Sequence, residues 1–429
     1  MQKRLMTLIL ILCAILLSIA PLHADETSWL WVDMAQPNGE ISPYVYGANY
    51  GLLNVVPFDL YSAAQASGIR YLRFPGGRVG DTHNIQKLQL DQFIALCRQL
   101  NTEPSISVRL EGGTPEQAAE MVEYVNITKG YGVQYWSIGN EPNLFNDYTT
   151  EQHNLDWRAI ADAMLAIDPT ITLIGPDTSQ FTGVDSYEGL ARAHDFLREF
   201  LRANGDMIDI VAVHRYPFPS GNAPTTIEEL RQDAHTWNDI IANLRQMVRD
   251  ETGEDLPIAI TEVNSHWSSN IGSEATPDSR FNAIWWSAVL GTLINNQVDM
   301  VAFFNLQTSD QLGGHGILAR YELRPTYYVY QLYQQFGTIS IVSGTDDANV
   351  IITAAQREDG TLTVIITNLY DNAVTRPLTI QNSDLTLSDG QYWLFDETHL
   401  AEELSWSEAV TDGVVYLPAQ SITLLVIEG

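Results

Sequence analysis

The chain has 429 residues, of which 45% are hydrophobic and 10% aromatic, a composition typical of a folded protein rather than a disordered one. It carries 53 acidic and 22 basic side chains, for a formal net charge of −31. This charge would repel phosphate backbones and anionic lipid headgroups, so nucleic acids and membrane surfaces are unfavourable partners.

The first 24 residues have the pattern of a secretory signal peptide. Lys3 and Arg4 precede a mostly apolar run over residues 5–20, and the small residue Ala24 follows shortly after. The run is shorter than the roughly 20 residues that a membrane-spanning helix needs, although a retained membrane anchor is the alternative. We therefore expect cleavage near Ala24, a secreted or extracytoplasmic protein, and no membrane partner after cleavage.

Cysteine usage agrees with a fold held together by its core. Removal of residues 1–24 takes away Cys13 and leaves Cys97 as the single cysteine. An intramolecular disulfide framework is then excluded, although extracytoplasmic proteins often have one.

The segment at residues 25–40 contains one predicted strand, and a regular strand and helix alternation follows at residues 41–336. Eight short apolar runs rich in Val, Ile and Phe are predicted strands, at residues 44–49, 69–74, 104–110, 133–140, 171–176, 209–216, 257–263 and 300–306. Apolar residues recurring every three or four positions predict helices at residues 58–67, 89–100, 115–129, 150–166, 187–203, 226–251, 278–296 and 324–336.

Eight strands that alternate with eight helices predict a (β/α)8 barrel, a TIM barrel of the α/β class. A doubly wound open sheet is the alternative, but no glycine-rich phosphate-binding fingerprint follows the first strand. After residue 336 the pattern changes to period-two strands separated by turn signals such as "EDG" (358–360) and "TDG" (411–413). Residues 337–429 are therefore predicted to form a small antiparallel β-sandwich, which the strand at residues 25–40 would join.

Polar side chains gather where the predicted barrel strands end, which is where barrel enzymes carry their chemistry. A single polar strand end is usually a loop anchor, but six on one rim are harder to explain by structure alone. They are Asn49 and Tyr50 after the first strand, Arg73 after the second, Asn140 and Glu141 after the fourth, His214 and Tyr216 after the sixth, Glu262 and Asn264 after the seventh, and Asn305 and Gln307 after the eighth.

Two glutamates dominate this set. Glu141 and Glu262 end the fourth and seventh strands, which face each other across the mouth of the barrel. Two carboxyl groups that flank a bond are the equipment of glycoside hydrolysis, in which one protonates the leaving oxygen and the other attacks the anomeric carbon or activates water. A metal site is the alternative use of opposed carboxylates, but the chain has no paired histidine spacing such as HExxH. We expect neither a metal nor another cofactor.

The residues around both glutamates resemble a known group. "WSIGNEPN" (136–143) and "AITEVNS" (259–265) are similar to the acid/base and nucleophile strands of the clan A glycoside hydrolases. "ISPYVYGANYG" (41–51) and "LRFPGG" (72–77) resemble the arabinofuranosidase-like, glucuronidase-like and xylosidase-like branch, whose members carry a β-sandwich built from both chain ends. The resemblance implies a retaining mechanism, with Glu141 as general acid/base and Glu262 as nucleophile.

The same resemblance implies roles for neighbouring residues. Asn140 would bind the 2-hydroxyl of the sugar, and Arg73 would hold Glu262 ionised because a nearby positive charge lowers the pKa of a carboxyl group. Tyr216 would donate to the same carboxylate, and His214 either orients the acid/base, contacts the sugar or is a structural partner. Two aromatic residues at the rim, Tyr50 and Trp267, are candidate platforms on which a sugar ring stacks, with ordinary packing as the alternative.

These patterns predict a secreted retaining glycoside hydrolase whose partner is a carbohydrate substrate. Two alternatives from other classes are open: a non-catalytic carbohydrate-binding protein on the same barrel, and a metal-dependent barrel hydrolase. "GNEPN" with "HRYP" (214–217) favours glucuronidase-like or xylosidase-like members, whereas "RFPGG" favours arabinofuranosidase-like ones, so the sugar stays open. The sequence makes no prediction of the oligomeric state.

Overall fold

A computed structural model describes residues 28–184, 188–218, 225–268, 271–308 and 314–428. The predicted signal peptide lies outside the described residues. Within them, no helix combines the length and the apolar character that crossing a membrane requires.

Eight parallel strands form a closed barrel, as predicted, because β9 pairs back onto β2. Each predicted strand is present, several of them shortened by one to three residues at an end. In barrel order they are β2 (Gly47–Asn49), β3 (Tyr71–Phe74), β4 (Glu103–Val108), β5 (Tyr135–Ile138), β6 (Thr172–Thr178), β7 (Ile210–Arg215), β8 (Ile258–Val263) and β9 (Met300–Phe303).

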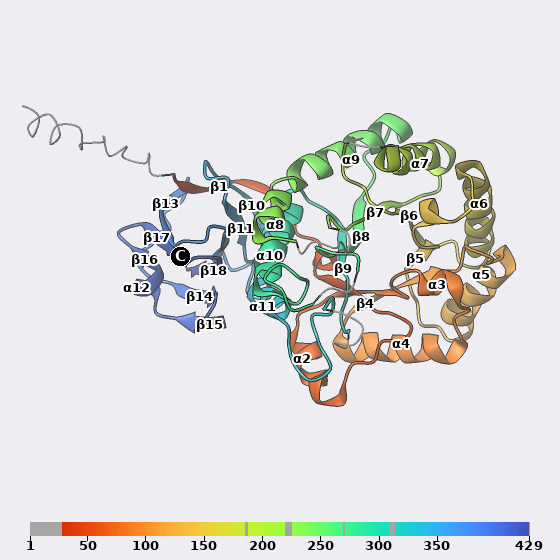
Figure 1. Cartoon of the computed structure of the whole chain (residues 1–429), viewed down its shortest axis with the longest axis horizontal. Helices are drawn as coiled ribbons and strands as arrows, with labels where there is room; N and C mark the ends of the chain where they lie inside the picture. The colour runs from red at the N-terminus through yellow and green to blue at the C-terminus, as the bar shows by residue number, and fades with distance from the viewer. Residues whose placement is uncertain (1–27, 185–187, 219–224, 269–270, 309–313, 429) are drawn as a thin grey trace, which may run out of the picture.

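Helices surround the barrel on its outside (Figure 1), and their apolar faces form one core with the outward residues of the strands. The main ones are α2 (Tyr61–Ala66), α4 (Lys87–Leu100), α5 (Pro115–Val122), α6 (Thr150–Ile167), α7 (Glu188–Asn204), α8 (Ile227–Ala234), α9 (Trp237–Thr252), α10 (Arg280–Asn295) and α11 (Pro325–Tyr333). A short helix, α3 (Val79–Thr82), follows β3 near the mouth of the barrel.

Two predicted helices are interrupted. The segment at residues 226–251 is divided into α8 and α9, because the Thr236 N–H donates to the carbonyl of Asp233, three residues back, in place of the α-helical bond to the fourth residue back. The segment at residues 115–129 leaves the α-helical pattern after Val122 and continues as a π-helix (Glu123–Thr128). Periodicity alone does not distinguish these local changes from a continuous helix.

The second domain is a ten-stranded sheet that includes the N-terminal strand, as predicted. In sheet order its strands are β15 (Leu400–Leu404), β14 (Gln391–Phe395), β18 (Ser421–Ile427), β12 (Leu362–Asn368), β11 (Val350–Gln356), β10 (Ile339–Thr345), β1 (Leu30–Glu40), β13 (Val374–Gln381), β17 (Val414–Leu417) and β16 (Val410–Thr411). All ten strands belong to one hydrogen-bonded sheet, and it is mixed because β1 runs antiparallel to β10 and parallel to β13. Residues from both sides of the sheet order, such as Leu425 of β18 and Val415 of β17, belong to one apolar core.

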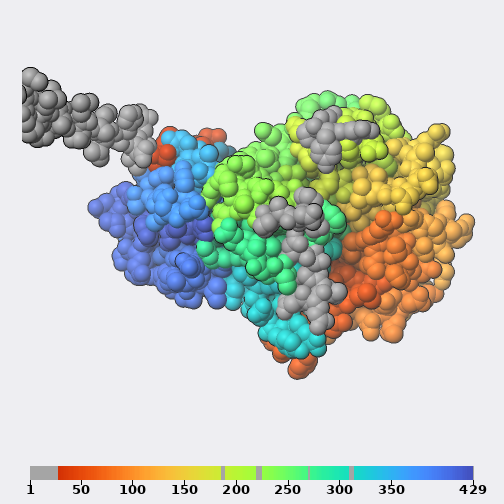
Figure 2. All heavy atoms as spheres, in the orientation of Figure 1, coloured from red at the N-terminus to blue at the C-terminus, as the bar shows by residue number. Residues whose placement is uncertain are grey.

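The two domains pack directly against each other through α8, α10 and α11, as the blue and green to cyan surfaces show (Figure 2). The interior of α10 is buried on every side, as expected for a helix between two layers. Arg231 on α8 donates to the carbonyl of Leu369 at 2.9 Å, and Arg280 on α10 donates to the carbonyl of Gln420 at 3.0 Å. The β domain therefore covers the helix that directly follows β8.

A glycine marks the closest approach between α10 and the β domain, and it yields a stability prediction. A Cβ on Gly291 would overlap Thr353 Oγ1 of β11 and lie 3.1 Å from the hydroxyl of Tyr333. We expect Gly291→Ala to destabilise the protein by about 1–3 kcal/mol, although an alanine in an open helix interior is usually stabilising. Urea unfolding measures this difference.

The double variant Gly291→Ala/Thr353→Ala provides the control. Thr353→Ala removes the atom nearest to the new methyl group. Gly291→Ala should therefore cost less free energy of unfolding in the Thr353→Ala background than in the native protein. A stabilising Gly291→Ala would show that the two layers are not in close contact here.

Candidate active site

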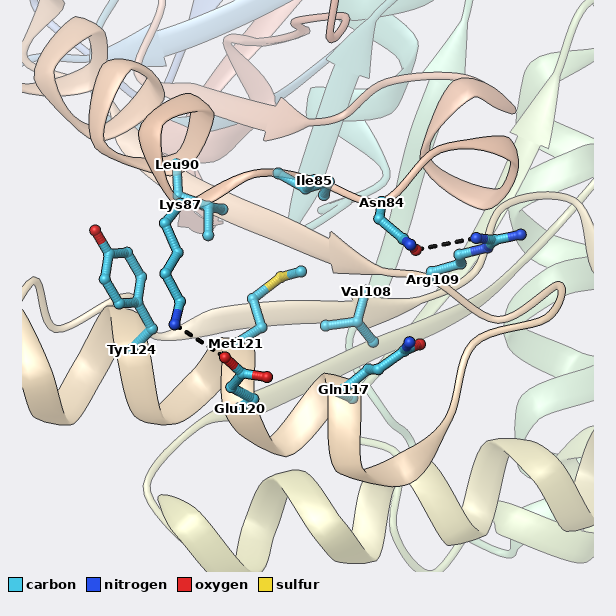
Figure 3. Close-up of a pocket in the computed structure, with 11 residues that line it drawn as sticks. Asn84, Ile85, Lys87, Leu90, Val108, Arg109, Gln117, Glu120, Met121 and Tyr124 are labelled. Atoms are coloured by element: carbon cyan, nitrogen blue, oxygen red, sulfur yellow. Dashed lines mark hydrogen bonds and ion pairs between the residues drawn. The ribbon is translucent and has the colours of Figure 1, made fainter.

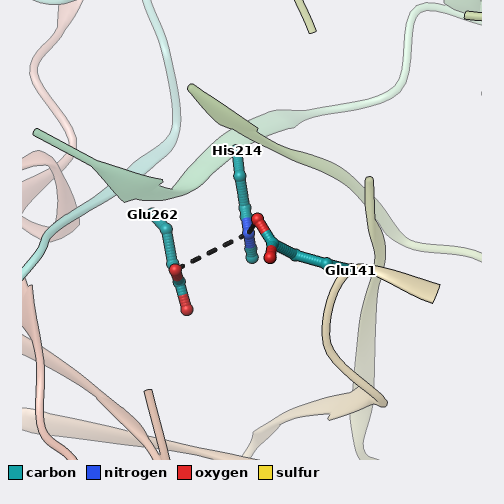
Figure 4. Close-up of side chains that lie close together, drawn as sticks. All are labelled: Glu141, His214 and Glu262. Atoms are coloured by element: carbon teal, nitrogen blue, oxygen red, sulfur yellow. Dashed lines mark hydrogen bonds and ion pairs between the residues drawn. The ribbon is translucent and has the colours of Figure 1, made fainter. Parts of the chain in front are cut away.

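Charged side chains from several strands meet at the mouth of the barrel. Glu141 follows β5, His214 lies on β7 and Glu262 lies on β8, and the three side chains converge in Figure 4. One donor atom from each of the three lies within 4.8 Å of the others. The two glutamates that the sequence places on separate strands are therefore side by side.

Glu262 is buried and is held by three donors. Arg73 Nη1 donates to its Oε1 at 2.8 Å, and the backbone N–H of Gly77 donates to the same oxygen at 2.7 Å. The hydroxyl of Tyr216 donates to Oε2 at 2.8 Å. Burial next to Glu262 raises the pKa of Tyr216 well above its ordinary value, so this hydroxyl stays protonated and remains a donor.

Arg73 is fully buried and links four residues of the mouth. Besides Glu262, its guanidinium donates to Asn49 Oδ1 at 3.0 Å, to Asn140 Oδ1 at 2.9 Å and to Asp177 Oδ2 at 3.1 Å. Asn49 in turn donates to the carbonyls of Thr261 and Ala302, both at 2.9 Å. A charged group buried without partners is very costly, and these acceptors offset that cost.

Glu141 has a different environment, since part of its side chain reaches the surface. His214 Nδ1 lies 3.1 Å from its Oε1. Burial alone would raise the pKa of Glu141, but the hydrogen bond and charge of His214, with a smaller contribution from Arg73, lower it below its ordinary value. The two carboxylates thus differ in access: Glu262 is enclosed by donors, whereas Glu141 faces outward.

His214 is buried between three carboxylates. Its Nδ1 lies 3.7 Å from Glu262 Oε2, besides its contact with Glu141, and its Nε2 lies 3.6 Å from Asp177 Oδ1. Burial alone would lower the pKa of His214, but Glu262, Asp177 and Glu141 raise it to about 9.

The backbone at two strand ends is left-handed, with φ of 50° at Glu141 and 57° at Asp177. Residues other than glycine seldom adopt this conformation, which costs roughly 1–2 kcal/mol. The backbone N–H of Glu141 donates to the carbonyl of Asp177 at 3.1 Å, so each turn supports the other. Next to them, Asn143 and Ser179 exchange two hydrogen bonds that join the loops after β5 and β6.

Asp81 connects the backbone after β4 with the backbone after β5. Its carboxylate accepts the backbone N–H groups of Leu110 at 2.8 Å, Glu111 at 3.2 Å and Asn140 at 2.7 Å. The side chain is buried, and burial raises the pKa of Asp81 despite these three bonds. Its position on α3 fixes the backbone of the residue before Glu141.

The structure assigns the remaining predicted residues to different places. Asn140 Nδ2 is buried without a partner among the described residues, so it is free to donate to a substrate. Asn305 is buried and accepts a hydrogen bond from Thr308, and among the described residues it makes no hydrogen bond to either glutamate. The Tyr50 hydroxyl donates to the carbonyl of Asn54 and its ring stacks on Phe93, which favours packing over sugar stacking.

Trp267 lies just beyond β8 and is 56% exposed. Its role as a sugar platform stays a prediction.

Sequence reasoning missed Asp177 and Asp81. Asp177 directly follows the predicted strand at residues 171–176, so a polar strand end was the signal that could have found it. Asp81 lies inside "FPGGRVGD", and nothing in that loop indicated that it reaches the fourth strand.

Glu141, His214 and Glu262 have donor atoms close enough to hold a cation, but their environment does not suit one. Both oxygens of Glu262 already accept hydrogen bonds, and the guanidinium of Arg73 lies 2.8 Å away. A separate hollow between α4 and α5 (Figure 3) contains the ion pair of Lys87 with Glu120, and neither Glu141 nor Glu262 lines it.

A pair of glutamates on the fourth and seventh strands of a (β/α)8 barrel, with an asparagine before the first of them, defines the class of clan A glycoside hydrolases. Residues 122–389, well over half of the chain, match the family described as "Glycosyl hydrolases family 39". The chain belongs to this family. The matched region contains Glu141, His214 and Glu262.

Individual relatives are more distant. The alpha-L-arabinofuranosidase C of Emericella nidulans is 26% identical over 239 residues, which cover 46% of each chain. The match thus spans about half the length of this curated relative. Two solved structures are similar over 94% of the chain and all of their own: the GH51 arabinofuranosidase from Xanthomonas axonopodis pv. citri, with 16% identity and a TM-score of 0.74, and the alpha-L-arabinofuranosidase from Thermotoga maritima, with 17% identity and a TM-score of 0.72. At these identities the structural likeness shows the fold.

The role of Asp81 gives a prediction about stability. Asp81→Ala leaves three buried backbone N–H groups without their acceptor, so we expect a loss of about 2–5 kcal/mol in the free energy of unfolding. Asp156→Ala is the matched control, because this carboxylate is partly exposed and accepts only side-chain donors, from Tyr148 and Gln152. We expect the control to cost less than about 1 kcal/mol. Equal losses in chemical denaturation would contradict the proposed bridging role of Asp81.

Proposed function

We propose that the protein is a secreted retaining glycoside hydrolase that uses Glu262 as nucleophile and Glu141 as general acid/base. The observation that carries the proposal is the close approach of the two carboxylates, whose nearest oxygens lie within 4.8 Å. Retaining enzymes hold their two carboxyl groups about 5–5.5 Å apart, whereas inverting enzymes leave about 6.5–9.5 Å for a water molecule.

In the first step, a carboxylate oxygen of Glu262 attacks the anomeric carbon while the bond to the leaving oxygen breaks, and Glu141 supplies the proton to that oxygen. In the second step, water attacks the same carbon, the bond to Glu262 breaks, and Glu141 accepts the proton of the water. Oε2 of Glu262 is the better nucleophile, because it accepts one hydrogen bond whereas Oε1 accepts two.

Asn140 supports this assignment. Its Oδ1 is fixed by Arg73 and its backbone by Asp81, so its unpartnered Nδ2 is held in one orientation. A donor fixed beside the reacting carbon suits the 2-hydroxyl of the sugar, a contact that strengthens as the transition state develops. A protein that only binds carbohydrate needs no nucleophile enclosed by three donors, which makes the non-catalytic alternative less favourable.

The substrate is proposed to be a neutral glycoside. The loops that follow the eight strands contain no lysine, and their arginines are Arg78, Arg109, Arg320 and Arg324. Arg78 pairs with Glu111 at 3.2 Å, and Arg109 donates to the carbonyl of the same residue. Arg324 is buried and donates to the carbonyls of Thr308 and Gly316. Arg320 is exposed, and its guanidinium lies 5.1 Å from the centroid of the Tyr321 ring. Among the described residues none of these four arginines contacts Glu141 or Glu262, so a uronic acid would meet the carboxylates of the mouth without a cation placed beside them.

Among neutral sugars we propose an arabinofuranoside. This proposal rests on the names of relatives, since the curated relative and the two solved structures named above are arabinofuranosidases. Secretion rests on the apolar run at residues 5–20 behind Lys3 and Arg4.

Two variants test the catalytic assignment. Glu262→Ala removes the nucleophile and should lower kcat by on the order of 10⁴-fold or more on every substrate. Glu141→Ala should lower kcat/KM by about 10²–10⁴-fold for a poor leaving group and much less for a 2,4-dinitrophenyl glycoside, which leaves without a proton. Azide should restore turnover to Glu141→Ala and yield a glycosyl azide of retained configuration. Activity in Glu262→Ala, or activity of the native protein that a chelator removes, contradicts the proposal.

Substrate charge is tested with a panel of nitrophenyl glycosides. We expect turnover of α-L-arabinofuranoside and less turnover of the β-D-xyloside. The β-D-glucuronide should have a kcat/KM at least about 10²-fold lower, because a carboxylate placed among uncompensated like charges costs several kcal/mol. Preferred hydrolysis of the glucuronide would contradict the proposal of a neutral substrate, because it would require a cation beside the sugar carboxylate.

A further inference from the structure

His214 and Asp177 form an arrangement that the double-displacement reaction does not by itself require. Both ring nitrogens of the buried imidazole face carboxylates: Nδ1 faces Glu141 and Glu262, and Nε2 faces Asp177. Arg73, bound to Asp177 and Glu262, is the other cation of the cluster. The cluster therefore contains three carboxylates and two basic groups, supplied by β3, β6, β7, β8 and the turn after β5.

The geometry restricts where the protons of this cluster lie. A neutral imidazole has a lone pair on one nitrogen, and that lone pair would point at a carboxylate on either side. Two arrangements avoid this repulsion. In the first, both nitrogens carry protons and Glu141 is ionised. In the second, Glu141 is protonated and donates to Nδ1, while the proton stays on Nε2, which lies 3.6 Å from Asp177 Oδ1 and has no hydrogen-bond partner among the described residues. The two arrangements differ by the position of one proton along the 3.1 Å contact between Nδ1 and Oε1.

We propose, building on the function above, that the proton which Glu141 delivers to the leaving group is stored on His214, and that Asp177 holds His214 in the state that stores it. In the first chemical step the proton moves from Nδ1 to Glu141 Oε1, and Glu141 releases it to the glycosidic oxygen as Glu262 bonds to the anomeric carbon. His214 is then a neutral imidazole whose lone pair faces a carboxylate, and this repulsion favours return of the proton in the next step. In the second step Glu141 takes a proton from the attacking water and returns it to Nδ1, which restores the resting enzyme.

The charge environment supports the stored state. With His214 raised to a pKa of about 9 and the pKa of Glu141 lowered, the resting proton lies on the imidazole at neutral pH. Asp177 is fully buried and keeps its own charge, because Arg73 and His214 lower its pKa more than burial raises it. Thr261 Oγ1 also donates to Asp177 Oδ1 and fixes the orientation of the carboxylate. His214 and Asp177 act through Glu141, so both are positioning residues.

The first test replaces Asp177 with asparagine, which keeps the shape of the side chain and removes its charge. The native enzyme should lose kcat/KM on the alkaline side with an apparent pKa near 9. Since a negative charge close to an imidazole raises its pKa, Asp177→Asn should move this alkaline limb to lower pH by about one unit or more.

Leaving groups separate proton storage from a structural role. Asp177→Asn should lower kcat/KM at pH 8.5 by about tenfold or more for a glycoside with an alkyl leaving group, and much less for the 2,4-dinitrophenyl glycoside. The matched control is Asp233→Asn, since Asp233 is also a buried carboxylate paired with an arginine, Arg215, but it lies among the outer helices and contacts Trp237 and Trp285. This control should lose stability without a shift of the alkaline limb. Equal losses on both leaving groups with an unmoved limb in Asp177→Asn would overturn the proposal.

A spectroscopic measurement decides the location of the proton without relying on turnover. In protein labelled with ¹⁵N-histidine, with His214→Asn used to assign the resonance, both ring nitrogens of His214 should be protonated at pH 7. In Asp177→Asn the imidazole should titrate at lower pH. A neutral imidazole in the native protein at pH 7 overturns the inference. If no glycoside is hydrolysed, the proposed function fails, and the ¹⁵N spectrum still shows whether His214 holds the proton.

Discussion

The mouth of the barrel depends on one buried guanidinium. Arg73 has no exposed side-chain surface, and it contacts carboxylates supplied by β6 and β8 together with amide oxygens from β2 and the turn after β5. A buried ion pair is seldom a large net source of stability, because desolvation cancels most of the attraction. What Arg73 provides is position. Without it, Asp177 and Glu262 would each lose an ion pair, and the four residues that it links would lose their common partner.

The rest of the fold makes this arrangement rigid. Asp81 fixes the backbone before Glu141, and the left-handed turns at Glu141 and Asp177 are held by a hydrogen bond between them. Behind β8, the fully buried α10 lies between the barrel and the β domain, so the strand that carries Glu262 is supported from outside. Catalytic groups need this kind of support, because small displacements are costly when charges must be placed accurately.

Sequence reasoning could predict much of this molecule. The eight barrel strands and the N-terminal strand of the β domain are present, because strand periodicity carries that information. The pairing of Arg73 and Tyr216 with Glu262, which the resemblance to clan A glycoside hydrolases implied, is present as two hydrogen bonds. Asp177 was missed although it directly follows the predicted strand, because Pro176 interrupts the apolar pattern just before it. Asp81 was missed because its partners are backbone groups, which have no signature in sequence. The interruption between α8 and α9 was likewise invisible to periodicity.

The same charges that the catalytic reaction uses also bear on which substrate fits. With His214 protonated, three carboxylates face two cations, so the site has an excess of one negative charge. A glycosyl transition state carries positive charge on the sugar, and an unbalanced carboxylate stabilises it without any further group. A substrate with its own carboxylate would bring a second negative charge into this surplus. Moving the stored proton from His214 to Glu141 leaves the net charge of the site unchanged. The electrostatic field that stabilises the transition state therefore does not weaken while Glu141 is being protonated. Proton storage on a neighbouring imidazole therefore lets one site keep a net negative charge and still have an acid available at neutral pH.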